Sequence, residues 1–169
     1  MERLWAPWRM TYVSKPDKEE SGCFFCAKAA STDDRYAQVI ARGAGAFVLL
    51  NTYPYNTGHV MVAPYRHTGE IDDLDDAELL EIVRLGSWSR RVLTRAMHPD
   101  GFNWGLNLGR SAGAGIVDHV HLHVVPRWSG DTNFMPVTAE AKVMPHSLES
   151  VWEQLRAAAD DLELPPVGV

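Results

Sequence analysis

Three histidines alternate with apolar residues in one short segment, His119-Val120-His121-Leu122-His123. Alternation with a period of two is typical of a β-strand. The three imidazoles are therefore expected to share one face, and the apolar residues to pack into a core on the other. Imidazole titrates near neutral pH and can act as a nucleophile, a proton carrier or a metal ligand. Three histidines in alternation beside a glycine-rich segment are difficult to explain by packing alone, so we interpret this segment as a chemical site.

The two cysteines of the chain, Cys23 and Cys26, form a second motif. A pair with this spacing can be half of a zinc site, a redox pair or two small buried hydrophobic residues. A redox motif normally opens a helix within a thioredoxin-like βαβ unit, and that sequence context is missing. Zinc needs about four ligands, so a zinc site would take further ligands from elsewhere in the chain. We favour zinc, with a reduced thiol pair as the alternative.

The composition is that of an ordinary globular protein. Of the 169 residues, 46% are hydrophobic and 22% are charged, which suits one domain with a sizeable core. The net charge of −6 argues against non-specific binding of nucleic acid, although a local site can still bind a small anion. No apolar run approaches the ~18 residues of a membrane span, and the N-terminal segment lacks the apolar core of a signal peptide. We therefore expect a cytoplasmic protein that binds neither nucleic acid nor membrane.

Five segments have the pattern of β-strands, and two have helical periodicity. The expected strands are Ala37–Ala41, Ala46–Asn51, His59–Ala63, Phe102–Leu108 and Asp118–Val125. The expected helices are Asp75–Met97, which opens with aspartates suited to a helix N-terminus, and Ser147–Ala159. Pro126 is expected to end the last strand. Because the strands come in hairpin pairs with one long helix inserted, we expect an antiparallel α+β domain.

The ends of the chain differ from its centre. Residues 1–22 combine several tryptophans with a polar stretch and are expected to form an N-terminal arm. A single domain is expected over residues 23–160, followed by a flexible tail over residues 161–169.

The segment His119–Val125 resembles the signature of the histidine-triad (HIT) family of nucleotide hydrolases and transferases. Other motifs extend the resemblance over roughly residues 3–137, namely Leu4–Arg9, Cys23–Cys26, Asn51–His59, Pro64–His67 and Pro126–Phe134. The first and last of these resemble one branch in particular, which contains bacterial diadenosine tetraphosphate phosphorylases. The resemblance implies a five-stranded antiparallel sheet with helices, a HIT-like fold that is usually paired as a homodimer.

The resemblance also implies a reaction. The middle histidine, His121, would attack the α-phosphate of a nucleotide, and water or another acceptor would resolve the nucleotidyl-histidine. His123 would donate to a phosphate oxygen, and His59 would orient its neighbours. A diadenosine polyphosphate is the expected substrate, with inorganic phosphate as acceptor in phosphorolysis to ADP and ATP. The alternatives are a hydrolase of dinucleoside polyphosphates or nucleoside phosphoramidates, a nucleotide-binding module without activity, and a zinc-dependent redox or structural protein.

Six residues outside the triad are candidates for contact with the nucleotide. They are Asn51, Asn107, Gly113, Gly115, Arg127 and Trp128. By its motif position Asn51 would hold the ribose, since its amide can both donate and accept, and a turn-forming asparagine is the alternative. Asn107 and the glycines would line the phosphate path, although a plain hairpin turn explains the glycines as well. Arg127 and Trp128 would touch phosphate or base, or else pack at the sheet edge.

The zinc ligands and one departure from the family follow from the same resemblance. In zinc-bearing relatives a histidine after the second strand and the first triad histidine complete the cysteine pair, and the matching residues here are His67 and His119. Many triad hydrolases carry glutamine and then serine or threonine before the triad, where this chain has Gly115 and Ile116. Neither side chain can donate a proton, which disfavours a purine phosphoramidate hydrolase.

Overall fold

A five-stranded antiparallel sheet forms the centre of the computed structural model, which describes residues 22–131 and 147–166. The strand order is β1-β2-β3-β5-β4, so the two halves of the chain meet where β3 pairs with β5. The strands are β1 (Val39–Arg42), β2 (Ala46–Leu50), β3 (Val60–Pro64), β4 (Gly101–Leu106) and β5 (Leu122–Arg127). The expected five-stranded antiparallel α+β fold is confirmed. The predicted arm lies outside the described residues except for Gly22.

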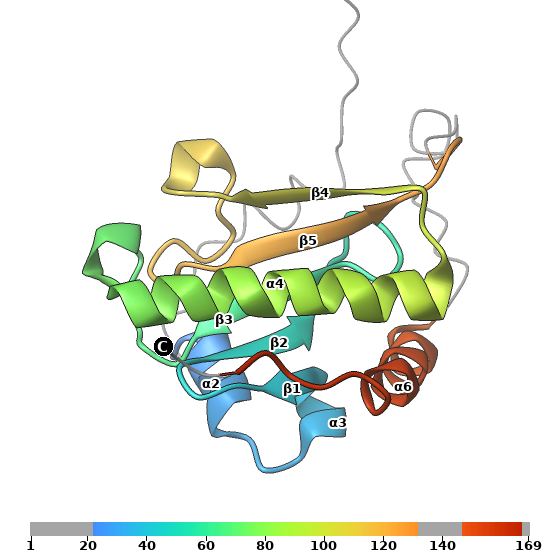
Figure 1. Cartoon of the computed structure of the whole chain (residues 1–169). Helices are drawn as coiled ribbons and strands as arrows, with labels where there is room; N and C mark the ends of the chain where they lie inside the picture. The colour runs from blue at the N-terminus through green and yellow to red at the C-terminus, as the bar shows by residue number, and fades with distance from the viewer. Residues whose placement is uncertain (1–21, 132–146, 167–169) are drawn as a thin grey trace, which may run out of the picture.

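Two long helices cover the sheet on one side (Figure 1). Helix α4 (Asp76–Met97) begins with a capping box between Asp75 and Glu78, as the run of aspartates predicted. Helix α6 (Leu148–Ala159) packs beside α4 and β1. Their apolar faces and the strands form the larger hydrophobic core, which includes Trp88 and Leu155. None of the helices within residues 22–131 and 147–166 combines the length and the hydrophobicity that a membrane span requires.

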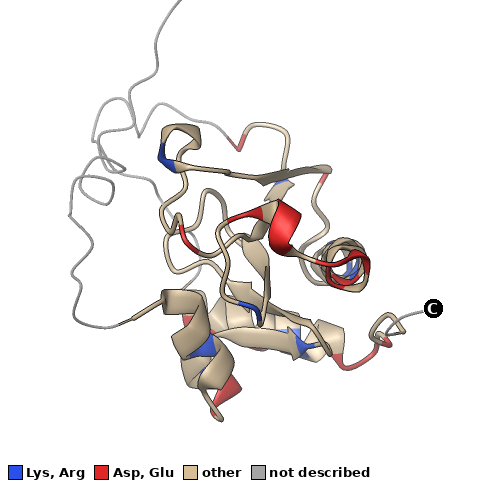
Figure 2. Cartoon of the chain, turned by 90° about the vertical axis from the view of Figure 1, so that its left-hand side faces the viewer, with Lys and Arg blue, Asp and Glu red and all other residues tan. Residues whose placement is uncertain are grey.

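The opposite face of the sheet carries α2 (Phe24–Ala30), and the short helix α3 (Asp34–Ala37) packs beside β1; neither helix was predicted from the sequence. Figure 2 looks along the axis of α4 and shows α2 away from it, across the sheet. A smaller core lies on this face and contains Phe25, Phe47 and Met61. Because α3 ends at Ala37, β1 begins two residues later than expected, after Gln38 in the left-handed conformation. Short 3₁₀ turns, η1 (Ile71–Asp73) and η2 (Arg110–Ala112), lie in the connections.

The histidine segment differs from its prediction at both ends. Regular pairing in β5 begins at Leu122, so His119 and His121 precede the strand. The expectation that Pro126 ends the strand is wrong, because Pro126 lies inside β5 and pairs with Phe102. Proline is tolerated there because the register with β3 extends only as far as Val124, which leaves one strand neighbour at that point.

Residues 161–166 lie against α4. The Trp88 indole donates to the carbonyl of Leu162, and Arg84 donates to the carbonyl of Pro166. The packed part of the chain thus continues past α6 to residue 166. The rest of the predicted flexible tail, residues 167–169, lies outside the described residues.

Candidate functional site

Four histidines are buried on the α2 side of the sheet. His59 and His119 are 0% exposed, whereas His121 and His123 keep 6% and 7% of their surface. The residues between the triad histidines, Val120 and Leu122, pack into the larger core on the other side, as the alternation predicted. The two histidines that retain contact with solvent are therefore the second and third of the triad.

The hydrogen bonds of His59 determine which of its nitrogens carries the proton. The backbone N–H of Tyr55 donates to His59 Nδ1 at 3.1 Å, and the Asn51 amide nitrogen lies 3.3 Å from the same atom. Since Nδ1 accepts, the proton of the neutral ring is on Nε2. That nitrogen lies 3.0 Å from Nδ1 of His123 and donates to it. His123 must then carry its own proton on Nε2.

The outer nitrogen of His123 belongs to a converging pair of donors. Its Nε2 lies 3.4 Å from the side-chain nitrogen of Asn107, which itself is 3.5 Å from the carbonyl oxygen of Gly113. With the proton of His123 on Nε2, both nitrogens are donors, so their 3.4 Å contact is not a hydrogen bond between them, and an anionic oxygen is the acceptor that suits the pair.

His121 has the opposite arrangement of its nitrogens. Its Nδ1 lies 2.8 Å from the backbone carbonyl of His119, which can only accept, so Nδ1 carries the proton and Nε2 keeps its lone pair. Burial lowers the pKa of His121, which favours the neutral ring. The rings of His121 and His123 meet edge to face with their centres 4.7 Å apart. A ring nitrogen with a lone pair thus lies beside a group of N–H donors.

A second cluster lies next to the triad and contains Cys23, Cys26, His67 and His119, whose ligand atoms are all within 4.8 Å of one another. The sulfurs of Cys23 and Cys26 lie 3.2 and 3.7 Å from Nδ1 of His119. Nδ1 of His67 lies 3.3 Å from the same atom. In a tetrahedral zinc site with Zn–S of ~2.3 Å and Zn–N of ~2.0–2.1 Å, a sulfur–nitrogen edge is about 3.5 Å and a nitrogen–nitrogen edge about 3.3 Å. The donor set and its spacing therefore fit zinc.

Neighbouring groups orient the two histidines of this cluster. Nε2 of His119 lies 2.9 Å from the carbonyl of Pro64 and donates to it, which leaves Nδ1 as the free ligand atom. Nε2 of His67 lies 3.8 Å from a carboxylate oxygen of Asp118. Burial lowers the pKa of His119, so its ring is neutral, as a metal ligand must be.

Of the six predicted nucleotide contacts, two lie against the histidines, namely Asn51 beside His59 and Asn107 beside His123. The Asn51 side-chain oxygen accepts from the backbone N–H of Tyr53, which is the turn-forming role weighed as the alternative, while its nitrogen faces His59. Its contact with ribose stays a prediction.

The glycine-rich segment is exposed at Gly113 and Gly115. Gly113 has φ of 88° and ends η2, so the turn requires glycine there. Ile116 is partly buried against the smaller core. The position that carries a hydroxyl in many triad hydrolases thus contributes to packing in this chain.

Arg127 is bound within the protein. Its guanidinium pairs with both carboxylate oxygens of Asp131 at 2.6 and 2.7 Å and donates to Asn103 at 2.8 Å. Asp131 also accepts from the backbone N–H of Trp128. This arrangement matches the edge-packing alternative, and contact of Arg127 or Trp128 with a nucleotide stays a prediction.

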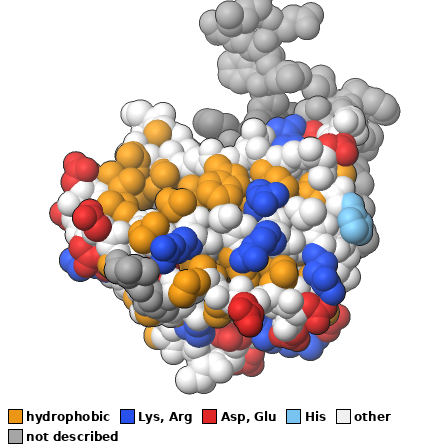
Figure 3. Space-filling view, in the orientation of Figure 1, with side chains coloured by type: hydrophobic (Ala, Val, Ile, Leu, Met, Phe, Trp, Pro, Cys, Tyr) orange, Lys and Arg blue, Asp and Glu red, His pale blue; other side chains and the backbone are white. Residues whose placement is uncertain are grey.

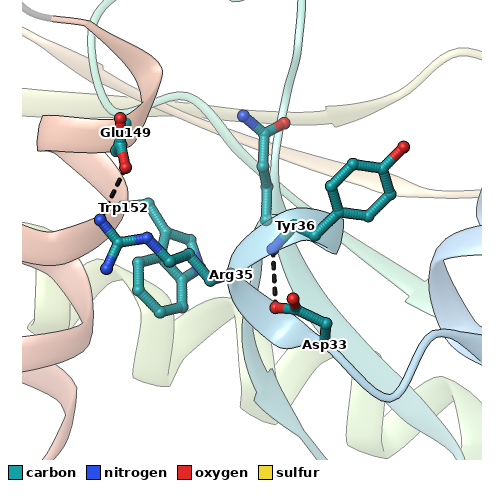
Figure 4. Close-up of a pocket in the computed structure, with 6 residues that line it drawn as sticks. Asp33, Arg35, Tyr36, Glu149 and Trp152 are labelled. Atoms are coloured by element: carbon teal, nitrogen blue, oxygen red, sulfur yellow. Dashed lines mark hydrogen bonds and ion pairs between the residues drawn. The ribbon is translucent and has the colours of Figure 1, made fainter.

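A hollow between α3 and α6 lies apart from the histidines (Figure 4). Arg35 crosses it and pairs with Glu149 at 2.6 Å, and its guanidinium lies over the Trp152 ring. Asp33 accepts from the backbone N–H of Tyr36. Because these charged groups already pair with each other or with the backbone, the hollow offers little to a ligand.

Comparison with known proteins agrees with this geometry. Residues 32–130 match the HIT domain family, so the chain belongs to the HIT family. The chain is 41% identical over 154 residues to the AP-4-A phosphorylase of Mycobacterium tuberculosis, which covers 88% of this chain and 79% of that protein. A zinc-bound histidine triad family protein from Mycobacterium smegmatis is 27% identical, with a TM-score of 0.66 over 83% of this chain and 94% of that one.

A more distant structure shares the fold alone. The diadenosine triphosphate hydrolase of Plasmodium falciparum is 18% identical, with a TM-score of 0.61 over 92% of this chain and 95% of that one.

The ion pair of Asp131 makes a pH-dependent contribution to stability. Its hydrogen bonds with Arg127 lower the pKa of Asp131 from 3.8 to about 2. A lowered carboxyl pKa stabilises the fold above the unfolded value, and this stabilisation is lost as the pH falls from about 3.8 towards 2. We predict that Asp131→Asn lowers the free energy of unfolding by roughly 1 kcal/mol at neutral pH, with the difference from wild type shrinking below pH 3.8.

Denaturant unfolding across this pH range measures the difference. Asp160→Asn is the matched control, because Asp160 also pairs with an arginine four residues away, but its side chain is 68% exposed. A difference for Asp131→Asn that does not change with pH would contradict the assignment.

Proposed function

We propose that this protein transfers a nucleotidyl group from a dinucleoside polyphosphate, with diadenosine tetraphosphate as the expected substrate and inorganic phosphate as the acceptor. The observation that carries the proposal is the opposite protonation of His121 and His123, inferred from their hydrogen bonds. The 41% identity to a mycobacterial AP-4-A phosphorylase supports the substrate and the acceptor.

The first step forms a bond to His121. Its Nε2 lone pair attacks the α-phosphorus in line with the bridging oxygen, and the phosphorus–oxygen bond breaks with its electron pair on the departing ATP. The ring retains the Nδ1 proton throughout, held by the carbonyl of His119. The positive charge of the resulting N-phosphorylated imidazole is therefore placed beside a carbonyl dipole.

The second step releases the histidine. An oxygen of inorganic phosphate attacks the same phosphorus, the nitrogen–phosphorus bond breaks, and ADP leaves while Nε2 regains its lone pair. His123 and Asn107 donate to the non-bridging oxygens in both steps, where negative charge is greatest. His59 keeps the proton of His123 on the outward nitrogen.

Water in place of phosphate would give AMP, which makes the chain a hydrolase. The similarity to an AP-4-A phosphorylase favours phosphate as the acceptor, and phosphate is already an anionic nucleophile at neutral pH.

Product analysis with diadenosine tetraphosphate separates these reactions. We predict ADP and ATP in equal amounts, formed only when inorganic phosphate is present. His121→Asn should lower the rate at least ~10³-fold, because the amide has no comparable nucleophile. His98→Asn is the matched control, since His98 is exposed in a left-handed position that asparagine tolerates.

If AMP and ATP form at the same rate with or without phosphate, the reaction is hydrolysis and the proposed phosphorolysis is refuted. Full activity in His121→Asn would refute the assigned nucleophile.

We also propose that the cluster of Cys23, Cys26, His67 and His119 binds structural zinc. A bound ion would cross-link α2, the segment after β3 and the triad segment, without taking part in the transfer. The zinc-bound relative supports this assignment, as does the fit of the ligand spacing to a tetrahedron.

Zinc content and stability test the cluster. We predict one zinc per chain in the wild type, loss of the metal in Cys23→Ser, and a fall in unfolding free energy of more than about 3 kcal/mol. Cys23 is the N-cap of α2, where serine is favoured, so the substitution itself does not weaken the helix. His98→Asn should keep the zinc. A wild-type protein without zinc, or an unchanged Cys23→Ser, would contradict the site.

The exposed edge of the sheet supports a homodimer. At the other edge, Trp152 and Arg156 of α6 donate to carbonyls of β1, whereas β4 is an exposed edge strand. Hydrophobic side chains gather over β4 and α4 (Figure 3), including Trp104 at 40% and Val83 at 55% exposure. An uncovered apolar edge strand invites pairing with another chain. We propose that a second copy covers this surface.

Light scattering on the purified protein should give twice the chain mass of 18.8 kDa. Val83→Lys places a charge in the proposed interface and should shift the protein towards monomer. Tyr36→Lys is the control, because Tyr36 is 83% exposed but lies on α3. A wild-type monomer would contradict the dimer.

A further inference from the structure

Phe25 lies between the cysteine–histidine cluster and the proposed nucleophile. Its ring is 1% exposed, with its centre 5.0 Å from that of His119 and 4.6 Å from that of His121. The same residue stands between Cys23 and Cys26 at the start of α2. The two thiols that approach His119 therefore flank the residue that covers the neighbouring ring of His121.

A second connection runs through the backbone. The side chain of His119 faces the cluster through Nδ1 and is fixed from behind by the carbonyl of Pro64. The carbonyl of His119 itself accepts the Nδ1 proton of His121. The ring of His121 is thus held at one edge by this carbonyl and on its face by Phe25.

We propose that Phe25 is a positioning residue, and that the cysteine–histidine cluster orients His121 through Phe25 and the carbonyl of His119. This inference rests on the proposed function, because it assigns His121 as the group that is positioned. It assigns to the CxxC motif a role in catalysis besides stabilising the fold.

The physical reason is the freedom of the imidazole. Rotation of a histidine ring about its Cβ–Cγ bond is only weakly restricted by the side chain itself. A half-turn about this bond would exchange the positions of Nδ1 and Cδ2, and those of Nε2 and Cε1, and it would break the bond to the carbonyl of His119. The Phe25 ring at 4.6 Å and the His123 ring at 4.7 Å, measured between ring centres, restrict the space for this rotation.

Phe25 also belongs to the smaller core, so its loss would disturb packing in any case. Phe47 is the control for a purely structural role of Phe25, because it is 0% exposed in the same core and stacks on Tyr65. Phe47→Leu therefore removes a comparable ring from that core, one that stacks on a tyrosine instead of a histidine.

The experiment compares Phe25→Leu with Phe47→Leu and the wild type by two measurements. The first is the nitrogen-15 spectrum of the histidine rings in alkaline buffer without substrate, where a protonated Nδ1 and an unprotonated Nε2 have distinct shifts. The second is kcat and KM for diadenosine tetraphosphate. Phe25→Met, which fills similar volume without a ring, replaces Phe25→Leu if that variant does not fold.

We expect Phe25→Leu to retain zinc and to shift the His121 nitrogen signals towards a mixture of tautomers. Its kcat should fall ~10- to 100-fold while KM changes less than about threefold, since small misplacement of a reacting group has costs of this size. Phe47→Leu should keep the wild-type His121 signals and lose less than about threefold in kcat. The inference is overturned if the Phe25 variant matches Phe47→Leu in spectrum and kcat.

The spectrum separates this inference from the proposed function. It reports the orientation of His121 without turnover, so a failure to cleave diadenosine tetraphosphate would refute the substrate and leave the spectral comparison as the test of Phe25. Conversely, normal cleavage with unchanged His121 signals in the Phe25 variant would refute the positioning role alone.

Discussion

A single hydrogen bond, from Nδ1 of His121 to the backbone carbonyl of His119, decides which nitrogen of the central histidine carries the proton. At 2.8 Å it places the proton on the inner nitrogen and leaves the lone pair on the outer one, which is the nitrogen of the proposed attack. The chain from Tyr55 through His59 to His123 does the reverse for the neighbouring ring. Two identical side chains, two residues apart, thus carry their protons on opposite ring nitrogens because of the groups behind them.

The fold is what places those groups. Pairing of β3 with β5 brings His59 beside His123, although 64 residues separate them in the chain. The apolar alternation of the triad segment anchors its other face in the core under α4. The turn after β3 contributes as well, because the carbonyl of Thr68 accepts from the backbone N–H of Val120 at 2.7 Å. Both sides of the triad segment are therefore held before a ligand arrives.

The sequence predicted the parts of this site that depend on local pattern. The alternation at His119 to His123 indicated that the imidazoles share one face with a packed apolar face behind them, and the aspartates before residue 76 indicated a helix start. The ligand set of the cluster came from the resemblance to relatives, and the structure brings those four side chains together.

Other features depend on contacts that no local pattern reveals. Helix α2 is only seven residues long, and its apolar residues gave no clear period. The place of Phe25 against two histidines follows from tertiary packing across 94 and 96 residues of chain. Arg127 was expected either at the nucleotide or packed at the sheet edge. Its pairing with Asp131, four residues later, is one that the charge pattern could have suggested. Proline lacks a backbone N–H, so Pro126 was expected to end the strand. It lies inside β5 because the pairing of β5 with β3 stops at Val124, which leaves β4 as the one strand neighbour of Pro126.

Direct detection of the nucleotidyl-histidine tests the central claim about His121. The protein would be mixed with diadenosine tetraphosphate in the absence of phosphate, quenched in alkali to preserve the nitrogen–phosphorus bond, and mapped by mass spectrometry of its peptides. An adenylyl group on His121 that disappears when phosphate is added, with ADP as the product, is the predicted result. Turnover of the substrate without an adduct, or with the adduct on a different residue, would contradict it.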